Sequence, residues 1–303
     1  MTILVAGATG LAGSAIMREL VKRKKSVVGI SSKDVNLLDR KATFDYVQDL
    51  KPTIIIDAAA KVGGIGGNNA FPVDFLSENI QIQTNLIDAA HTVKVERFVF
   101  LGSNCIYPKD CPQPIKEEYI LSGALEPTNS AYAIAKLSGM ELIKSYRKQY
   151  GHKWISLMPI NLYGPNDNFD LKSSHVFAAL IRKFTDATKN NSDTVTIWGT
   201  GKPKREFLHA DDFARATLLC LEEYDSDLHI NIGMGADISI NDLADKISQI
   251  VGFKGKIIWD SSKPDGAKEK LLDIQKISNL GWSPLINLEQ GIQLTIDWYR
   301  QNG

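Results

Sequence analysis

Ser103, Tyr132 and Lys136 have the types and spacing to stabilise and protonate a carbonyl oxygen. Tyr132 and Lys136 stand four residues apart, so a helix would place them one turn apart on the same face. A free phenol, with a pKa of about 10, is a poor proton relay at neutral pH, and an adjacent ammonium lowers that value. These side chains predict the chemistry of a nicotinamide-dependent carbonyl reductase.

A thiol stands two residues after the serine, at Cys105. Residues 99–101 are predicted to form a buried parallel strand, and ligands of open α/β sheets bind beyond the carboxyl ends of such strands. If the backbone stays extended past Leu101, Ser103 and Cys105 point to the same side. A nearby cation would bring the thiol, with a pKa of about 8.5, within reach of a base role. The alternative for Cys105 is a small buried hydrophobe.

His175 follows Lys172-Ser-Ser at the expected start of a helix. It is a second candidate acid or base, and the alternative is a surface or capping residue. A thiol and an imidazole beside a reductase triad indicate more than a plain dehydrogenase.

A glycine loop follows the first predicted strand and opens a helix. Its glycines would allow a tight turn, close approach of the backbone to a diphosphate and close helix–strand packing, and the helix N-terminus would attract the anion. The position in a βαβ pattern favours a dinucleotide site over an ordinary turn. The loop residues expected to contact the cofactor are Gly7, Thr9, Gly10, Leu11, Ala12 and Gly13.

The end of the second strand bears on the choice of cofactor. NAD sites usually place an acidic residue about 20 residues beyond the glycines. This chain has Ser31, Ser32 and Lys33 there, with Asp34 only after the lysine. Hydroxyls and an ammonium suit a 2′-phosphate, so NADP(H) is expected, and the alternative for Lys33 is a solvated turn residue.

Residues 196–209 combine an indole, at Trp198, with several cations and glycines. Such a loop could stack a base and hold a diphosphate through Arg205. The alternative is a plain surface loop.

Composition excludes several other classes of function. The 303 residues carry 35 basic and 35 acidic side chains, so neither nucleic acid nor an anionic membrane is an expected partner. The three cysteines make no disulfide framework, and no Cys/His spacing resembles a zinc site, so no metal is expected. No segment approaches the roughly 20 apolar residues of a membrane span. A soluble, cytoplasmic protein is expected.

The pattern along the chain is typical of an α/β fold: a Rossmann-type doubly wound parallel sheet with a second, smaller α/β substrate lobe. Strands are predicted at 3–6, 26–30, 53–57, 97–101 and 154–158, and helices near 11–24, 41–50, 73–93 and 130–150. Shorter elements follow, with helices at 240–251 and 288–299. The expected dinucleotide-binding domain comprises residues 1–165 plus about 206–232, with 209–223 packing back on it. Residues 166–205 and 233–303 would form the other lobe.

With these segments assembled, nearly the whole chain resembles the GDP-L-fucose synthases, which are extended short-chain dehydrogenases/reductases. The motif around Cys105 and the segment that begins at Asn161 are specific within that superfamily. The matching stretches are 7–16, 36–39, 58–65, 102–109, 125–129, 132–136, 161–169, 174–176, 205–209 and 263–266.

The resemblance implies conversion of GDP-4-keto-6-deoxy-D-mannose to GDP-L-fucose, by epimerisation at C3 and C5 and then reduction by NADPH at C4. Tyr132 would protonate the C4 oxygen with help from Ser103, Lys136 would hold the nicotinamide ribose, and Cys105 and His175 would be the base and acid of epimerisation. Further implied cofactor contacts are Asn36, Leu37, Leu101, Gly102, Pro159, Ile160, Asn161 and Leu162, together with Lys136 and His175. Implied nucleotide-sugar contacts are Asn161, Lys183, Trp198, Arg205 and Asp265. Two positions depart from some relatives, which carry a second serine at Asn104 and a basic residue at Thr9.

Two other functions stay open from the residues. One is a related enzyme that only reduces a nucleotide 4-keto sugar, or that acts on another 4-keto-deoxysugar such as the GDP-L-colitose precursor. The other is a non-catalytic NADPH-binding protein.

A homodimer is also expected. Apolar residues of the two long helices extend beyond one core-facing stripe, at Ile80, Ile87, Leu137 and Met140, which suggests a four-helix contact across a two-fold axis.

Overall fold

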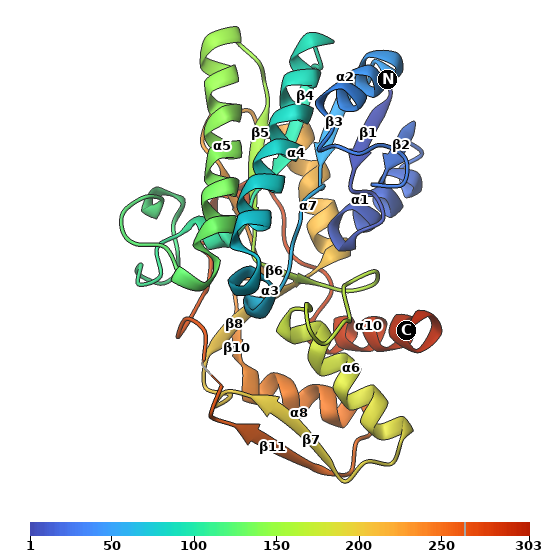
Figure 1. Cartoon of the computed structure of the whole chain (residues 1–303), viewed down its shortest axis with the longest axis vertical. Coiled ribbons are helices and arrows are strands. Elements are labelled where there is room, and N and C mark those ends of the chain that lie inside the picture. The colour runs from blue at the N-terminus through green and yellow to red at the C-terminus, as the bar shows by residue number, and fades with distance from the viewer. Residues whose placement is uncertain (264) are drawn as a thin grey trace.

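A parallel six-stranded sheet forms the centre of the larger lobe (Figure 1). The computed structural model describes residues 1–263 and 265–303; Pro264, within the 263–266 stretch of the resemblance, lies outside the described residues. The sheet order is β2-β1-β3-β4-β5-β9, and every neighbouring pair is parallel. The strands are β1 (Ile3–Ala6), β2 (Val27–Ile30), β3 (Ile54–Asp57), β4 (Arg97–Leu101), β5 (Ile155–Pro159) and β9 (Ile230–Ile232).

Helices cover both faces of this sheet because alternate strand residues bury to opposite sides. On one face Ile3 and Val5 share an apolar core with α1 (Leu11–Lys22) and α7 (Ala210–Glu223). On the other face Leu4 and Ala6 pack with α2 (Arg40–Leu50), α4 (Pro72–Thr92) and α5 (Ser130–Tyr150). Short segments complete this lobe: α3 (Ile65–Ala70), η1 (Asn104–Ile106), η2 (Glu117–Tyr119) and η3 (Pro127–Asn129). The predicted fold class is confirmed, and the predicted strand and helix bounds agree with the structure to within two residues, except that the last helix, predicted at 288–299, ends three residues later, at Asn302.

The smaller lobe has its own core, which includes Phe177, Phe184 and Ile247. Its helices are α6 (Val176–Lys189), α8 (Ile240–Val251) and α10 (Leu288–Asn302). One sheet joins β6 (Asn161–Tyr163), β8 (Lys204–His209) and β10 (Asp237–Ser239), and a second pairs β7 (Thr194–Trp198) with β11 (Lys256–Asp260). Leu272, Ile277 of α9 (Gln275–Asn279) and Trp282 pack instead with the core of the larger lobe, although the expected boundary assigned 233–303 to the smaller one.

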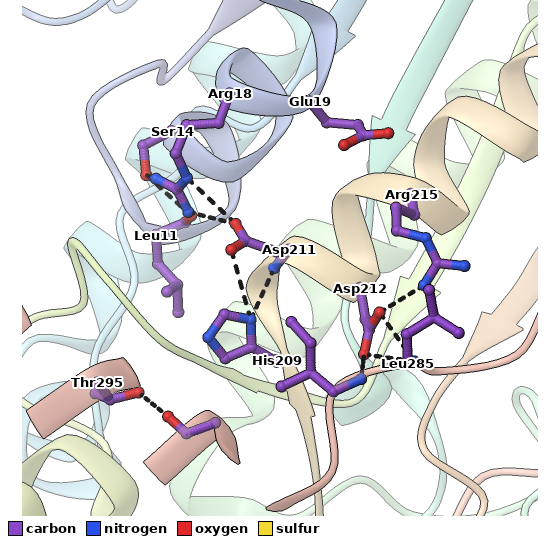
Figure 2. Close-up of polar contacts among 12 residues, drawn as sticks. Leu11, Ser14, Arg18, Glu19, His209, Asp211, Asp212, Arg215, Leu285 and Thr295 are labelled. Atoms are coloured by element: carbon purple, nitrogen blue, oxygen red, sulfur yellow. Dashed lines mark hydrogen bonds and ion pairs between the residues drawn. The ribbon is translucent and has the colours of Figure 1, made fainter. Parts of the chain in front are cut away.

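The segment after His209 returns to the larger lobe, as expected, and is fastened there by ion pairs (Figure 2). Arg18 of α1 donates to Asp211 of α7 at 2.5 and 3.2 Å. Asp212, fully buried, accepts from the backbone N–H groups of Leu285 and Ile286 ahead of α10. The helix that opens at the glycine loop is therefore tied through α7 to the chain leading into the smaller lobe.

Helices α4 and α5 lie side by side along the edge of the molecule (Figure 1). The four residues from which a second apolar face was predicted are buried to different degrees. Ile87 is fully buried in the core, Leu137 and Met140 pack against that core, and Ile80 is half-buried. The prediction was therefore wrong for Ile87, whereas Leu137, Met140 and Ile80 stay partly exposed and their part in a second face stays a prediction.

Candidate active site

The carboxyl end of β4 presents Ser103 and Cys105. Ser103 is extended, with φ −163° and ψ 148°, but the chain then turns into the short helix η1. The condition that the backbone stays extended past Leu101, on which the shared side of Ser103 and Cys105 depended, is therefore not met. The turn closes because the Ser103 hydroxyl accepts a hydrogen bond from the Cys105 N–H at 3.3 Å. Cys105 is buried directly behind the serine, 4% exposed.

Helix α5 supplies Tyr132 and Lys136 one turn apart, as predicted. The Lys136 ammonium is buried, donates to the Leu101 carbonyl at 2.8 Å and lies 5.9 Å from the centre of the Tyr132 ring. Lys136 therefore bridges the end of β4 to the tyrosine.

The charge state of Tyr132 differs from the sequence-based expectation. Burial, with Cys105 and Asp57 nearby, raises the pKa of Tyr132 above its usual value. The expected lowering by Lys136 is not seen because the ammonium faces the Leu101 carbonyl, and burial lowers the pKa of Lys136 itself. A phenol that holds its proton suits an acid that donates to an alkoxide.

Burial also raises the pKa of the Cys105 thiol, although Ser103 and the cations Lys270 and Lys136 act in the opposite direction. Two cations therefore lie near the thiol, where one was expected, but desolvation has the larger effect on its pKa. Thiolate would form more readily at higher pH.

His175 occupies the position before the first residue of α6, with extended φ and ψ. Its ring lines the same cavity as Ser103 and Tyr132 and is accessible from it. His175 is exposed at the cavity, and desolvation by the protein atoms around it lowers its pKa. A neutral imidazole at neutral pH follows.

One cavity of about 630 Å³ collects most of the predicted site. It runs from the glycine loop, past the ends of β1 to β5, to Ser103, Tyr132 and His175. Of the predicted cofactor contacts, all except Lys33 line it: Gly7, Thr9, Gly10, Leu11, Ala12, Gly13, Ser31, Ser32, Asn36, Leu37, Leu101, Gly102, Lys136, Pro159, Ile160, Asn161, Leu162 and His175.

The glycine loop fits a dinucleotide for steric reasons. A Cβ at Gly7 would lie 2.6 Å from the Ala58 carbonyl oxygen, and one at Gly13 would lie 2.1 Å from the Gly7 carbonyl oxygen. Gly10 precedes α1 and has only that Gly7 oxygen, at 3.6 Å, near its Cβ position among the described atoms. No side chain of the described residues caps α1, which leaves its first N–H groups available to a diphosphate.

The polar groups of the turn after β2 form hydrogen bonds with one another, which the sequence did not indicate. Both the backbone N–H and the hydroxyl of Ser31 donate to Asp34 at 2.8 Å, and these bonds lower the pKa of Asp34. The Lys33 N–H donates to the Ser31 hydroxyl at 3.3 Å, and Lys33 and Asp34 are exposed. The Asp34 carboxylate therefore accepts the hydrogen bonds that close the turn in which it lies.

The predicted nucleotide-sugar contacts other than Asn161 gather in the smaller lobe, around the turn between β7 and β8. Asp265 accepts from the N–H and hydroxyl of Thr200 at 2.9 and 2.7 Å. A Cβ at Gly266 would lie 2.8 Å from an Arg205 guanidinium nitrogen. Trp198 is 63% exposed, and the Lys183 ammonium donates to the Thr196 carbonyl at 2.8 Å. Cations, a carboxylate and an open indole thus share one region.

The structure adds several polar groups that sequence reasoning missed. Lys61, Glu78 and Asp167 line the cavity, and burial raises the pKa of Asp167 to about 7. Lys270 is buried near Cys105 but comes from an extended segment with no local pattern to identify it. Asp57, at the carboxyl end of the apolar strand β3, could have been found, since a polar residue there is a recognisable signal. In the part of the chain that the structure describes, no group of His, Cys, Asp and Glu side chains is arranged to hold a metal.

Comparisons with known proteins agree with this geometry. Residues 3–233 match the model of the NAD dependent epimerase/dehydratase family. GDP-L-fucose synthase 1 of Arabidopsis thaliana is 48% identical over 301 residues, covering 99% of this chain and 93% of that protein. A GDP-L-colitose synthase of Yersinia pseudotuberculosis is 37% identical, covering 99% and 98%. The crystal structure of a GDP-L-fucose synthetase from Naegleria fowleri bound to NADP is 29% identical, with a TM-score of 0.92 and coverage of 99% and 94%. The chain therefore belongs to the NAD dependent epimerase/dehydratase family and, within it, to the GDP-L-fucose synthases.

Proposed function

We propose that this chain converts GDP-4-keto-6-deoxy-D-mannose to GDP-L-fucose by epimerisation at C3 and C5 followed by NADPH-dependent reduction at C4. One observation carries the proposal: an imidazole and a Ser–Tyr–Lys triad line a cavity that begins at a dinucleotide-binding loop, and the buried Cys105 adjoins that triad, its N–H bonded to the Ser103 hydroxyl. The higher identity to the fucose synthase than to the colitose synthase supports the choice of sugar.

The cavity residues fit NADP(H), which when bound supplies a hydride to C4. The N-terminus of α1 would hold the diphosphate, Ser31 and Ser32 border the region for the 2′-phosphate, and Lys136 would hold the nicotinamide ribose. Tyr132 keeps its proton because it is buried, so it can protonate the C4 oxygen as negative charge forms there. The Ser103 hydroxyl would donate a second hydrogen bond to the same oxygen.

Epimerisation precedes reduction because it needs the C4 ketone. Protons α to the ketone are acidified, since the enolate places charge on the oxygen that Ser103 and Tyr132 stabilise. Inversion requires a base on one face of the sugar and an acid on the other. Cys105, after β4, and His175, ahead of α6, come from different elements and are assigned as this base and acid. Inversion by this pair needs Cys105 as the thiolate and His175 protonated, the two charged forms that burial disfavours.

Product analysis tests the proposal directly. Incubation with NADPH and GDP-4-keto-6-deoxy-D-mannose in D₂O should give GDP-L-fucose with deuterium at C3 and C5. A C4-reduced product without deuterium at those carbons would show a reductase only, and no NADPH oxidation would reject the assignment.

We infer further that the chain forms a homodimer through the outer surface of α4 and α5. The support is the exposed apolar side chains that these helices carry, Val73, Ile134 and Tyr150. Light scattering at micromolar concentration should give about twice the chain mass of 33.5 kDa, and a monomer would contradict the inference.

We also propose a cytoplasmic location. The three cysteines are free and buried, and among the described residues no helix is long and apolar enough to cross a membrane. Cell fractionation should find the chain with the cytoplasmic marker, and recovery outside the cytoplasm would overturn this.

A further inference from the structure

A buried carboxylate lies beneath the catalytic pair and has no part in the mechanism above. Asp57, the last residue of β3, is 1% exposed. Its Oδ1 accepts from the Ala59 N–H at 3.1 Å, whereas Oδ2 has no hydrogen-bond partner within residues 1–263 and 265–303. Burying a carboxylate oxygen without a donor is costly, so a compensating charge is needed nearby.

The register of the sheet shows where a compensating positive charge lies. Asp57 is the partner of Phe100 across the parallel pair β3–β4, so both side chains project to the same face of the sheet. The Lys136 ammonium lies 4.9 Å from the centre of the Phe100 ring, on that face. Carboxylate and ammonium therefore lie on the same face of the sheet, near the ends of the same two strands, and both are shielded from solvent.

The other titratable groups around Asp57 and Lys136 come from α5, η1 and the α4 side. From α5 the groups that face the pair are Lys136 itself and Tyr132, and from η1 the group is Cys105. On the α4 side, Asp74 and Glu78 are engaged by Lys61 at 3.1 and 2.7 Å. Lys136 is thus the cation that acts on Asp57 among the described residues.

The mutual effects agree with this arrangement. Burial raises the pKa of Asp57 to about 6, and Lys136 opposes that rise. Burial lowers the pKa of Lys136, which Asp57 opposes in turn. Asp57 also contributes to the raised pKa of Tyr132.

We propose that Asp57 is a positioning residue of the C4 reduction: as the buried counter-ion of Lys136, it keeps the proton on the Tyr132–Lys136 pair. Its effect on turnover rests on the proposed function, whereas the electrostatic interaction between Asp57 and Lys136 does not. Removing the negative charge makes it easier for the pair to lose its proton, so activity would be lost at lower pH.

The pH dependence of single-turnover NADPH oxidation tests this. Asp57→Asn keeps the size of the side chain but removes the charge, so the alkaline limb of the profile should move down by about one pH unit with KM for the sugar unchanged. Asp57→Glu restores the charge and should move the limb back. The matched control is Asp212→Asn, which alters a buried carboxylate bound to the backbone of Leu285 and Ile286. It should lower the melting temperature and leave the profile in place. An unshifted limb in folded Asp57→Asn would overturn the proposal.

A second measurement requires neither turnover nor an Asp57 variant. In protein labelled with ¹³C at aspartate carboxyls, Lys136→Met should raise further the pKa of the Asp57 carboxyl, which burial already raises to about 6. An unchanged titration would overturn the electrostatic interaction between Asp57 and Lys136. If the wild type fails to reduce the keto sugar, the proposed function falls, while this titration still decides the role of Asp57.

Discussion

The glycine loop offers a matched pair of substitutions with opposite expected effects. At Gly13, an added Cβ would lie 2.1 Å from the Gly7 carbonyl oxygen and 2.7 Å from its carbon. Contacts between such atoms normally begin near about 3.5 Å, so α1 would have to move away from β1 by roughly 1 Å. Overpacking of this kind costs about 1–3 kcal/mol. Gly13→Ala should therefore lower both the melting temperature and the affinity for NADPH.

At Gly10 an added methyl group would make only an ordinary van der Waals contact. Its Cβ position is 3.6 Å from the Gly7 oxygen, and its φ of −78° and ψ of 175° suit alanine. Gly10→Ala should leave stability unchanged or raise it by up to about 1 kcal/mol, because the unfolded chain loses freedom. The methyl would nevertheless stand between the end of α1 and a diphosphate, which should weaken NADPH binding at least tenfold, or about 1.4 kcal/mol.

Scanning fluorimetry and titration of NADPH fluorescence measure the two effects separately. The expected outcome is a stability defect in Gly13→Ala alone and a binding defect in both variants. If Gly10→Ala binds NADPH as tightly as the wild type, the backbone of this loop does not approach the diphosphate and the steric reasoning is wrong.

Three further predictions concern the chemistry. Tyr132→Phe should lower the rate of C4 reduction by about 10²–10⁴-fold with the fold and cofactor binding intact, and deuterium exchange into the sugar should survive better; a loss below about tenfold would exclude Tyr132 as the acid. Lys33→Glu should weaken NADPH binding more than NADH binding in parallel titrations, and equal weakening would mean that Lys33 does not reach the 2′-phosphate. Because burial raises the pKa of Cys105, the deuterium exchange rate should increase with pH through the neutral range, as the thiolate fraction grows, and a flat profile would contradict a thiolate base.

Local patterns in the sequence predicted much of the fold. The alternation of short apolar strands with amphipathic helices predicted the first five strands and α5 because each such element buries its own stripe of side chains. The sixth strand, β9, was not predicted. Its three residues become a strand only by pairing with β5, so no local period distinguishes them.

The candidate site was predicted where its residues sit in motifs and missed where distant segments converge. The glycine loop, Tyr132 and Lys136 carry their spacing in the sequence, and the cavity brings them together. Lys270 reaches Cys105 only because the bridge between Ile115 and Leu272 draws that segment to the larger lobe. The 3₁₀ turn at Asn104 and the raised pKa of Tyr132 likewise depend on packing and burial, which the order of residues does not display.

The central claim, that one cavity performs both epimerisation and reduction, is tested most directly at Cys105. Cys105→Ser keeps the size and a polar atom but replaces the titratable thiol with a hydroxyl that cannot act as a base near neutral pH. With NADPH and GDP-4-keto-6-deoxy-D-mannose in D₂O, the account predicts little deuterium at C3 and C5 and slow formation of C4-reduced sugars that are not fully epimerised. Deuterium at both carbons at the wild-type rate, with GDP-L-fucose as the product, would contradict it.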